Sequence, residues 1–499
     1  MLSSTKRTGP PRGASTSRMN ELISERRQSS SPMRVLYFAP KECWPPNTGA
    51  RLRNYYLARE LAREARVVFL GFGEDGAGRR EETAASADRH WEKPAAFTRS
   101  VVSPLVGGAA PCERVITVPR ERDYTLSKLA GGLLGRAPLP VLNYTTAPMA
   151  QELAHLLTEQ RFDIVHMESI HLISYLPVIR TASSRPLVIC DWHNLESEVM
   201  RRYSRYSPSL ARRLYARITA HRLTSLSRRA LSLFDAHLVV SERDRDQLLE
   251  LSPEARVFVI ENGVDTTFHS DAELQRAYQE SCHRLRDVDD AVDDSGPGSE
   301  GIHLPPPRRH RVLFVGSMDY HANVDAAVHF AREYWPGIYR QRPELTFTIV
   351  GRYPRPEVSA LAHLPGIQVT GTVADVRPYY CEALAEVVPL RVGGGSRLKI
   401  LEAMAAGVPV ISTRLGAEGL GVKDGETIVL AETGDGFCRA LCDLADNETA
   451  WRRQMDAARL LVRARYDWLA IGDALREAHL RLTSRAAWLG PADLRGRLS

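Results

Sequence analysis

Residues Ala385–Thr413, AEVVPLRVGGGSRLKILEAMAAGVPVIST, decide the fold that we expect for this chain. The stretch opens with an apolar, β-branched run that is typical of a buried parallel strand. Strong helix formers follow from Arg397 and end at Gly407, before a second apolar run, VPVIST. A strand, a turn, a helix and a strand make one right-handed crossover unit. The stretch therefore predicts a doubly wound α/β sheet.

The glycine-rich turn at Gly393–Ser396 has the chemistry of a phosphate site. Glycines allow a ligand to approach the backbone, and free N–H groups at a helix start favour an anion. Arg397 and Lys399 add two cations. Glu402, about one and a half turns into the helix, would accept hydrogen bonds from ribose hydroxyls. On spacing alone, a tight strand–helix connection with a solvated glutamate fits the segment equally well.

The same pattern continues outward from this unit. Strand-like runs RVLFVGS, LTFTIVGR and IQVTGTV precede it, and an earlier set begins with MRVLYFAP at Met33. Residues 287–311 between the sets are acidic, then rich in Gly, Ser and Pro, then basic, as in a linker. We therefore predict two Rossmann-like domains of GT-B type with an inter-domain cleft at the carboxyl ends of both sheets. The expected parts are a disordered tail (1–32), an N-terminal acceptor domain (33–268), a linker or insert (269–310), a C-terminal donor domain (311–470), and a C-terminal helix and tail (471–499). Within the donor domain we expect the α/β pattern to end near the linker-like GDG at 434–436, with the final helices after it.

The composition fits two or three globular domains. The 499 residues are 43% hydrophobic and 25% charged, with a formal net charge of +6. This basic excess is small for the length, so it favours an anionic ligand or an anionic membrane surface over nucleic acid. The seven scattered cysteines form no C-x-x-C pair, and we find neither a membrane-spanning apolar run nor a secretory signal. These features predict a cytoplasmic protein.

The segment LKILEAMAAGVPVIST resembles the donor-site helix and following strand of retaining glycosyltransferases of family 4. Further pieces occur in the family's order: PPNTGARLRNYYLARELA, DWHNLESEVMRR, ENGVD, LFVGSMDYHANVDA and GTVADVRPYY. The chain is similar to bacterial sugar transferases of exopolysaccharide and PEP-CTERM sorting systems, from Met33 to about Asp467. The resemblance implies a nucleotide-sugar donor and a glycan or lipid-linked acceptor. It is also compatible with a peripheral contact between the protein and the inner membrane.

The resemblance also implies roles for individual residues. His193 would lie at the reacting sugar, and Arg397 and Lys399 would stabilise the leaving nucleoside diphosphate, so these three form the expected catalytic set. Arg51 and Glu196 would contact the acceptor. The expected donor site consists of Gly49, Gly316, Ser317, Thr372, Val373, Gly394, Gly395, Ser396 and the ribose-binding Glu402.

Three positions depart from the family pattern. The family often has two glutamates with seven residues between them, and Gly394 stands where the first would fall. The family's diphosphate-binding Arg and Lys appear here as Ser317 and Asn323. We expect Arg397 and Lys399 to supply the missing positive charge from the other side of the site.

Several candidates also have a structural interpretation. A lone histidine such as His193 is often a helix cap, and Glu196 and Glu198 suit the first turn of a helix. Arg51 and Arg53 suit a solvated helix start.

The role of two further features is left undecided by the sequence. His166 and Glu168 end another predicted strand, so they are candidates at the same sheet edge. The helix expected over 207–233, with Ser207 as its N-cap, is rich in arginine. It would contact either solvent or anionic lipid headgroups.

The sequence gives no support to a metal or a dinucleotide cofactor. The D-x-D at Asp244–Asp246 follows Ser241, a plausible N-cap, so its acids suit a helix start. The GFGEDG run at 71–76 leads into a low-complexity segment, whereas a dinucleotide fingerprint opens a helix, and no P-loop occurs. We therefore expect a metal-independent reaction without a cofactor.

These observations predict a retaining glycosyltransferase of exopolysaccharide or cell-surface polysaccharide synthesis. Two alternatives stay open, namely a nucleotide-sugar 2-epimerase of the same fold and a catalytically silent sugar- or nucleotide-binding scaffold, which Gly394 suggests. A dinucleotide oxidoreductase fits the sequence less well, because the one glycine fingerprint in the sequence, GFGEDG, does not open a predicted helix.

Overall fold

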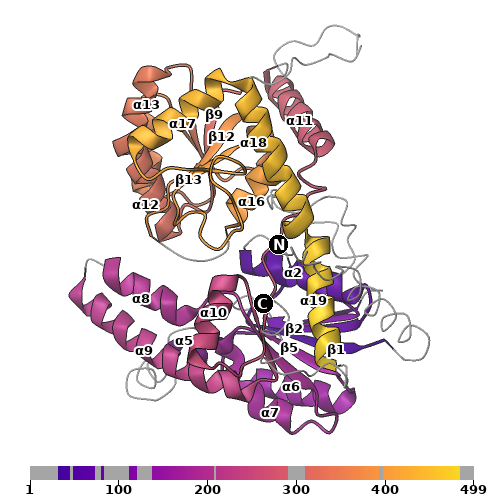
Figure 1. The fold of residues 1–499 in the computed structure, drawn as a ribbon. Helices are drawn as coiled ribbons and strands as arrows, with labels where there is room; N and C mark the ends of the chain where they lie inside the picture. The colour runs from indigo at the N-terminus through magenta and orange to yellow at the C-terminus, as the bar shows by residue number, and fades with distance from the viewer. Residues whose placement is uncertain are drawn as a thin grey trace, which may run out of the picture.

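The computed structural model describes residues 32–44, 46, 49–73, 80–83, 112–120, 138–206, 209–289, 309–392 and 397–483. Within these ranges the chain forms two α/β domains, one above the other in Figure 1, each built on its own sheet. The predicted fold class, two Rossmann-like doubly wound domains, is confirmed. The glycine-rich turn at 393–396 and nearly all of the predicted tail at 1–32 lie outside the described residues.

The first sheet has the strand order β3-β4-β2-β1-β5-β6-β7-β8, and its pairs are parallel except β3 with β4. The chain reverses its direction of travel through the sheet between β1 and β5, which makes a topological switch point there. The strands are β1 (Arg34–Ala39), β2 (Arg66–Phe72), β3 (Arg80–Thr83), β4 (Arg114–Val118), β5 (Ile164–Glu168), β6 (Leu187–Trp192), β7 (Ala236–Val239) and β8 (Val257–Val259).

Two apolar cores cover the two faces of this sheet, because alternate residues of its strands point to opposite sides. The helices of the domain are α2 (Gly49–Ala62), α5 (Leu139–Asn143), α6 (Ala147–Glu159), α7 (Leu176–Arg180), α8 (Glu196–Tyr206), α9 (Leu210–Leu233) and α10 (Glu242–Leu251). The helix that we predicted from Ser207 begins instead at Leu210, and the Ser209 hydroxyl accepts a hydrogen bond from the backbone N–H of Arg212.

The second sheet is parallel, with the order β11-β10-β9-β12-β13-β14 and a switch point between β9 and β12. Its strands are β9 (Arg311–Val315), β10 (Thr346–Val350), β11 (Ile367–Gly371), β12 (Ala383–Val388), β13 (Val410–Ser412) and β14 (Val429–Leu430). The helices around it are α11 (Asp271–Asp289), α12 (His321–His329), α13 (Trp335–Gln341), α14 (Pro356–Ser359), α15 (Arg377–Cys381), α16 (Leu398–Ala405), α17 (Gly434–Asp446) and α18 (Glu448–Leu461).

Two segments that we expected to be connections are helical. Helix α11 lies in the first half of the expected linker, and its Leu274 is buried in the core of the second domain. The GDG at 434–436 begins α17, because the Thr433 side chain caps the helix by accepting from the Gly436 N–H.

The last described helix, α19 (Trp468–Thr483), returns to the first domain and lies beside α2 in Figure 1. Its apolar residues Trp468, Ile471 and Leu475 are buried in the same core as α2 and β1. The Trp468 indole stacks on the Tyr56 ring with 4.9 Å between centroids. The first domain is therefore completed by the C-terminal end of the described chain.

Among the described residues, none of the helices is both long and apolar enough to span a lipid bilayer.

Candidate functional site

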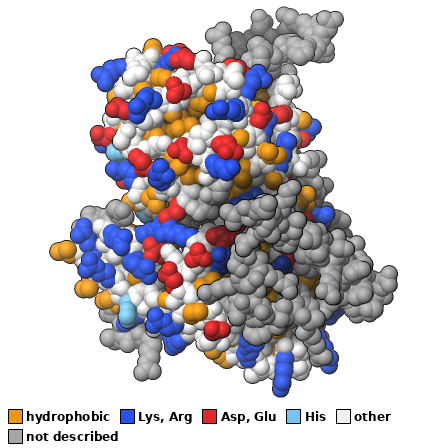
Figure 2. Space-filling model, viewed as in Figure 1, with side chains coloured by type: hydrophobic (Ala, Val, Ile, Leu, Met, Phe, Trp, Pro, Cys, Tyr) orange, Lys and Arg blue, Asp and Glu red, His pale blue; other side chains and the backbone are white. Residues whose placement is uncertain are grey.

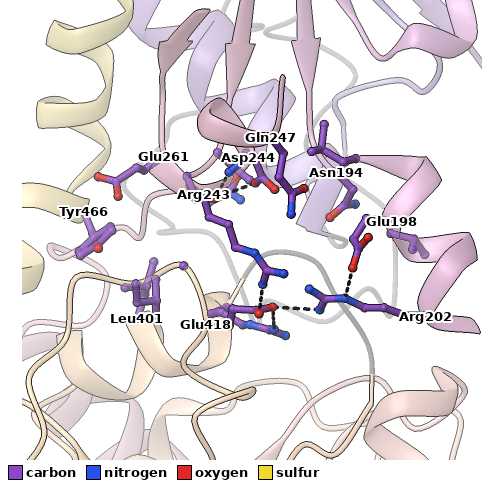
Figure 3. A pocket seen from close by; sticks show the side chains of 18 residues that line it. Asn194, Glu198, Arg202, Arg243, Asp244, Gln247, Glu261, Leu401, Glu418 and Tyr466 are labelled. Carbon is purple, nitrogen blue, oxygen red and sulfur yellow. Dashed lines mark hydrogen bonds and ion pairs between the residues drawn. The ribbon is translucent and has the colours of Figure 1, made fainter. Parts of the chain in front are cut away.

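A cavity lies between the two domains, at the carboxyl ends of both sheets (Figure 3). The first domain contributes α8, α10 and the segment after β8, and the second domain contributes α16 and the segment around residue 418. Its lining includes Asn194, Glu198, Arg202, Arg243, Asn262, Arg397, Leu401 and Glu418. The cleft that we predicted from the doubly wound pattern is therefore present.

The Glu418 carboxylate gathers arginines from both domains in this cavity. Arg202 on α8 approaches Glu418 with 2.9 Å between Nη1 and Oε2, and Arg243 on α10 pairs with the other oxygen. Arg397, from the second domain, lies 3.7 Å away. We call this set the Glu418 cluster. It ties the two domains together through ion pairs that domain opening would break.

Arg397 lies where a ligand in the cleft would meet it. It precedes α16 directly, is only 7% exposed, and donates a 2.7 Å hydrogen bond to the Leu415 carbonyl. Burial, reinforced by the nearby Arg202 charge, lowers the pKa of Arg397 to about 10, so the side chain remains a cation at neutral pH. The position fits the predicted role beside a phosphate, although Gly394, Gly395 and Ser396 lie outside the described residues.

Lys399 lies at the switch point of the second sheet, away from Glu418. Its Nζ donates to Asn323 Oδ1 at 2.8 Å and lies 4.1 Å from the centre of the Phe314 ring. A Cβ on Gly316 would come within 3.0 Å of the same Nζ, so glycine is what allows this close approach. The structure thus brings Gly316, which directly follows β9, together with Asn323 on α12 and Lys399 on α16.

Glu402 is one turn further along α16 and half-buried. Burial raises the pKa of its carboxyl to about 7, and the Lys399 charge opposes that shift. The neighbouring Leu401 lines the inter-domain cavity, whereas the Glu402 carboxyl is close enough to Lys399 for the lysine charge to act on its pKa. Among the described residues no donor is bonded to its carboxyl oxygens, which leaves the acceptor capacity that a ribose contact requires.

Arg352 is the residue at this site that sequence reasoning missed. It follows β10, and its Nε donates to the Ser317 hydroxyl at 3.1 Å. The two positions where the family has cations, Ser317 and Asn323, are therefore each hydrogen-bonded to a cation from elsewhere, Arg352 and Lys399. Lys399 thus lies beside one of the two positions where the family has a cation, and its role at the diphosphate stays a prediction. The dipeptide Gly351–Arg352 directly after a predicted strand could have indicated from the sequence that an arginine lies at this sheet edge.

Thr372 and Val373 follow β11 at the same end of the sheet, two strands away from β9. Thr372 is exposed and Val373 packs partly on the second core. Their predicted contact with the nucleotide base stays a prediction.

In the first domain, His193 follows β6 and pairs with Glu168, the last residue of β5. The His193 Nδ1 and Glu168 Oε1 atoms are 3.3 Å apart, and Asn54 donates to the other Glu168 oxygen at 2.8 Å. Burial lowers the pKa of His193 to about 3, so its ring is neutral at pH 7. Its Nε2 is buried and has no hydrogen-bond partner within the described ranges. That nitrogen therefore has an unused hydrogen-bonding position, although His193 is not among the residues that line the cavity between the domains.

The Arg53 side chain corrects an expectation, because it is 1% exposed and not a solvated helix-start residue. Its guanidinium makes a bidentate pair with buried Asp191, with 3.1 Å from Nη2 to Oδ1 and 3.3 Å from Nε to Oδ2, and donates to the Ile260 and Glu261 carbonyls. His166 is fully buried and lies 3.3 Å from the same aspartate. Arg53 has a structural role, since its guanidinium nitrogens all donate to groups inside the fold.

The remaining first-domain candidates lie near the cleft-facing sheet edge. Gly49 is the first residue of α2, after β1. Arg51 pairs with Glu42 at 2.9 Å. Glu196 begins α8, and burial raises the pKa of its carboxyl. Their contacts with donor or acceptor stay predictions.

The described residues contain no group of three His, Cys, Asp or Glu side chains that could hold a metal ion. The D-x-D acids lie in the first turns of α10, where the Ser241 hydroxyl accepts from the Asp244 N–H and donates to its carboxylate. The N-cap interpretation of this motif is confirmed.

The Glu168 carboxyl gives a testable pH dependence. Burial raises its pKa from 4.5 to about 8, so the folded protein binds this proton more tightly than the unfolded chain. The associated stability is present below pH 4.5 and is lost as the pH rises through 8. Relative to Glu168→Gln, the wild type should lose about 2 kcal/mol of unfolding free energy between pH 5 and pH 7.

Urea unfolding of the wild type and Glu168→Gln at both pH values measures this loss. Glu159→Gln, at an exposed site, is the control, and parallel wild-type and Glu168→Gln profiles would contradict the assignment.

Comparison with known proteins agrees with this architecture. The family model described as Glycosyltransferase Family 4 matches residues 48–268, and the model described as Glycosyl transferases group 1 matches residues 309–447. One curated relative, an uncharacterized 44.6 kDa protein in the cps region of Klebsiella pneumoniae, is 23% identical over 164 residues. That match covers 31% of this chain and 42% of the relative's length.

Several solved structures have the same fold. Sucrose-phosphate synthase from Thermosynechococcus elongatus is 17% identical and aligns over 90% of this chain and 99% of its own, with a TM-score of 0.59. HepE from Anabaena, solved in complex with UDP and glucose, is 14% identical over 90% of this chain and 99% of its own, with a TM-score of 0.54. A Burkholderia xenovorans α,α-trehalose-phosphate synthase is 15% identical over 91% of this chain and 100% of its own, with a TM-score of 0.56.

At these identities the structural likeness shows the fold alone, and the family follows from the two models, which together match most of the chain, one in each domain. The chain belongs to the group 1, family 4 glycosyltransferases.

Proposed function

We propose that this protein transfers a glycosyl group from a nucleotide sugar to a glycan or lipid-linked acceptor, with retention at the anomeric carbon. The observation that carries the proposal is the meeting of both sheets' carboxyl ends at one cavity, with Arg397 in its wall and Lys399 beside Gly316. HepE, a protein of the same fold, was solved with UDP and glucose, which supports a nucleotide-sugar donor. The Klebsiella relative from a cps region supports a role in cell-surface polysaccharide synthesis. The cytoplasmic location stays a prediction.

The proposed chemistry needs fixed positive charge. In glycosyl transfer the bond between the anomeric carbon and a diphosphate oxygen breaks, a bond to the acceptor oxygen forms, and the acceptor hydroxyl gives up its proton. Negative charge grows on the leaving diphosphate, and preorganised cations stabilise it more than the ground state. Lys399 and Arg352 flank the turn at Gly316 and Ser317, and Arg397 approaches from α16.

The Nε2 atom of His193 suits a hydrogen bond with a sugar hydroxyl. The Nδ1 side of the ring is held by Glu168, which fixes the orientation of the ring. Closure of the two domains would exclude water, so that the donor is not wasted by hydrolysis.

A panel of nucleoside diphosphate sugars tests the donor. A bound donor raises the apparent melting temperature by an amount that grows with its affinity. Turnover is then measured with and without acceptor, and the anomeric configuration of the product is read by NMR. An isomerised sugar formed without acceptor would assign an epimerase instead, and binding without turnover would assign a silent scaffold. An inverted product would overturn retention.

Glu402→Ala should weaken donor binding by about 10- to 100-fold, because hydrogen bonds to a charged group contribute about 1.5–3 kcal/mol. Isothermal titration with the donor found above measures it, and circular dichroism verifies the fold. Glu426→Ala, at an exposed site in the same domain, is the control. Unchanged donor affinity in Glu402→Ala would remove its ribose role.

We also propose that the reaction needs no metal ion, because Lys399 and Arg352, beside Asn323 and Ser317, would supply the positive charge that the diphosphate requires. Turnover should be unchanged in excess chelator. Loss of turnover that added Mg²⁺ or Mn²⁺ restores would contradict this.

A further inference from the structure

Helix α9 carries large apolar side chains that the fold leaves exposed. Leu210, Leu214 and Ile218, spaced four residues apart and so on one side of the helix, are 79%, 62% and 44% exposed, and neighbouring Tyr215 is 47% exposed. We call these four residues the α9 ridge. The opposite side of α9, including Ala216, Ala220 and Leu223, is buried. The ridge is therefore not required for packing within the chain.

The ridge lies at a projecting part of the molecule. In Figure 1, α8 and α9 form an antiparallel pair that extends outward from the first sheet, and α8 lines the inter-domain cavity. Figure 2 shows apolar and basic side chains gathered at this end of the first domain. A flat partner that met the ridge would therefore lie close to the cavity.

The charge on α9 has one sign. The 24 residues of α9 include six arginines and no aspartate or glutamate. Arg212 and Arg217 are exposed beside the ridge, and Arg228 and Arg229 are exposed further along the helix. On α8, Arg205 is also exposed. The partner that fits is apolar at its contact and anionic around it.

We propose that the α9 ridge docks on an anionic lipid surface, with α9 lying along the membrane. An interfacial helix inserts apolar side chains below the headgroups while its cations contact the anionic lipids, and this helix offers both. The contact extends the proposed function, since it would present the cavity wall formed by α8 to a lipid-linked acceptor. The docking itself does not depend on catalysis.

Two other partners fit the surface less well. A second copy of the chain that paired through the same face would place arginines against arginines, because an isologous contact opposes identical patches. Nucleic acid would meet the arginines but leave Leu210, Leu214 and Ile218 unused, since phosphate contacts carry most of its affinity.

The test is vesicle flotation with the full chain. Vesicles of phosphatidylcholine with about one third phosphatidylglycerol should bind the wild type, and pure phosphatidylcholine vesicles should bind it much less. Leu214→Glu/Ile218→Glu should reduce binding by at least about tenfold, because two inserted apolar groups are replaced by anions. Arg217→Gln/Arg228→Gln should reduce it by about fivefold for each charge removed.

The matched control is Leu460→Glu, since Leu460 is 71% exposed on α18 of the second domain. Its vesicle binding should equal that of the wild type. Equal binding of the ridge variant and the wild type, or no preference for anionic vesicles, would overturn the proposal. Sedimentation of a wild-type dimer that the ridge variant dissociates would also overturn it. Donor binding, measured by thermal shift, should be unchanged in the ridge variant, so failure of the donor proposal is detected separately.

Discussion

Arg53→Ala should lower the free energy of unfolding by about 3–5 kcal/mol, because it leaves a buried aspartate without its partner. Asp191 is fully buried, and Arg53 is its bidentate partner. The same guanidinium also satisfies the Ile260 and Glu261 carbonyls, which would lose their donor. Because Arg53 also donates to the Asn262 side chain, the change removes a charge pair and three further hydrogen bonds at once.

Denaturant unfolding measures this loss, and Arg51→Ala is a matched control on the same helix. Arg51 pairs with Glu42 near the surface, where such pairs contribute only about 0–1 kcal/mol. Equal losses in the two variants would contradict the assignment.

Asp191 adds a pH signature to the same interaction. Burial raises its pKa, but Arg53 and the neighbouring histidines outweigh that effect, and the net pKa lies well below its usual range. A carboxyl with a depressed pKa contributes stability above its unfolded pKa, and that stability is lost as the pH falls. Arg53→Ala should thus be less acid-sensitive than the wild type below about pH 4.

Arg397→Glu should reduce turnover by about 100- to 1000-fold, since removal of one stabilising group at a developing oxyanion has effects of that size. Arg397 lies in the cleft wall before α16, where the leaving diphosphate would gain charge. Acceptor affinity should change much less than kcat. Steady-state kinetics with both substrates varied measures the two effects separately.

The controls separate charge from domain closure. Arg391→Glu reverses a charge in the same domain at an exposed pair with Asp325. Glu418→Gln weakens the Glu418 cluster while it keeps Arg397 in place. Normal turnover in Arg397→Glu would contradict the role of Arg397 at the leaving group. An equal loss of turnover in Glu418→Gln would show that the loss comes from impaired closure of the two domains.

Local patterns predicted the two sheets and the cleft, because buried parallel strands are continuous apolar runs and their carboxyl ends meet at one edge. The same patterns placed His193 and Arg397 near that edge, as the structure does. Lys399 was expected to supply a missing charge, and it bonds Asn323 directly.

Long-range pairings account for what could not be predicted. Arg53 and Asp191 are 138 residues apart, and Arg352 reaches back 35 residues to Ser317. An arginine at a helix start has the same local pattern whether it faces solvent or a buried carboxylate. Ser207 was a good N-cap by type, but Ser209, two residues on, fills that position.

The return of α19 to the first domain has a consequence for synthesis on the ribosome. The surface that Trp468, Ile471 and Leu475 cover belongs to α2 and β1, which are made early. About 200 residues separate Phe268 from Trp468. At a synthesis rate of roughly 5–20 residues per second, α19 is therefore made on the order of 10–40 s after the rest of the first domain. During that interval an apolar face around Tyr56 is uncovered, and it is a natural target for chaperones that act on growing chains.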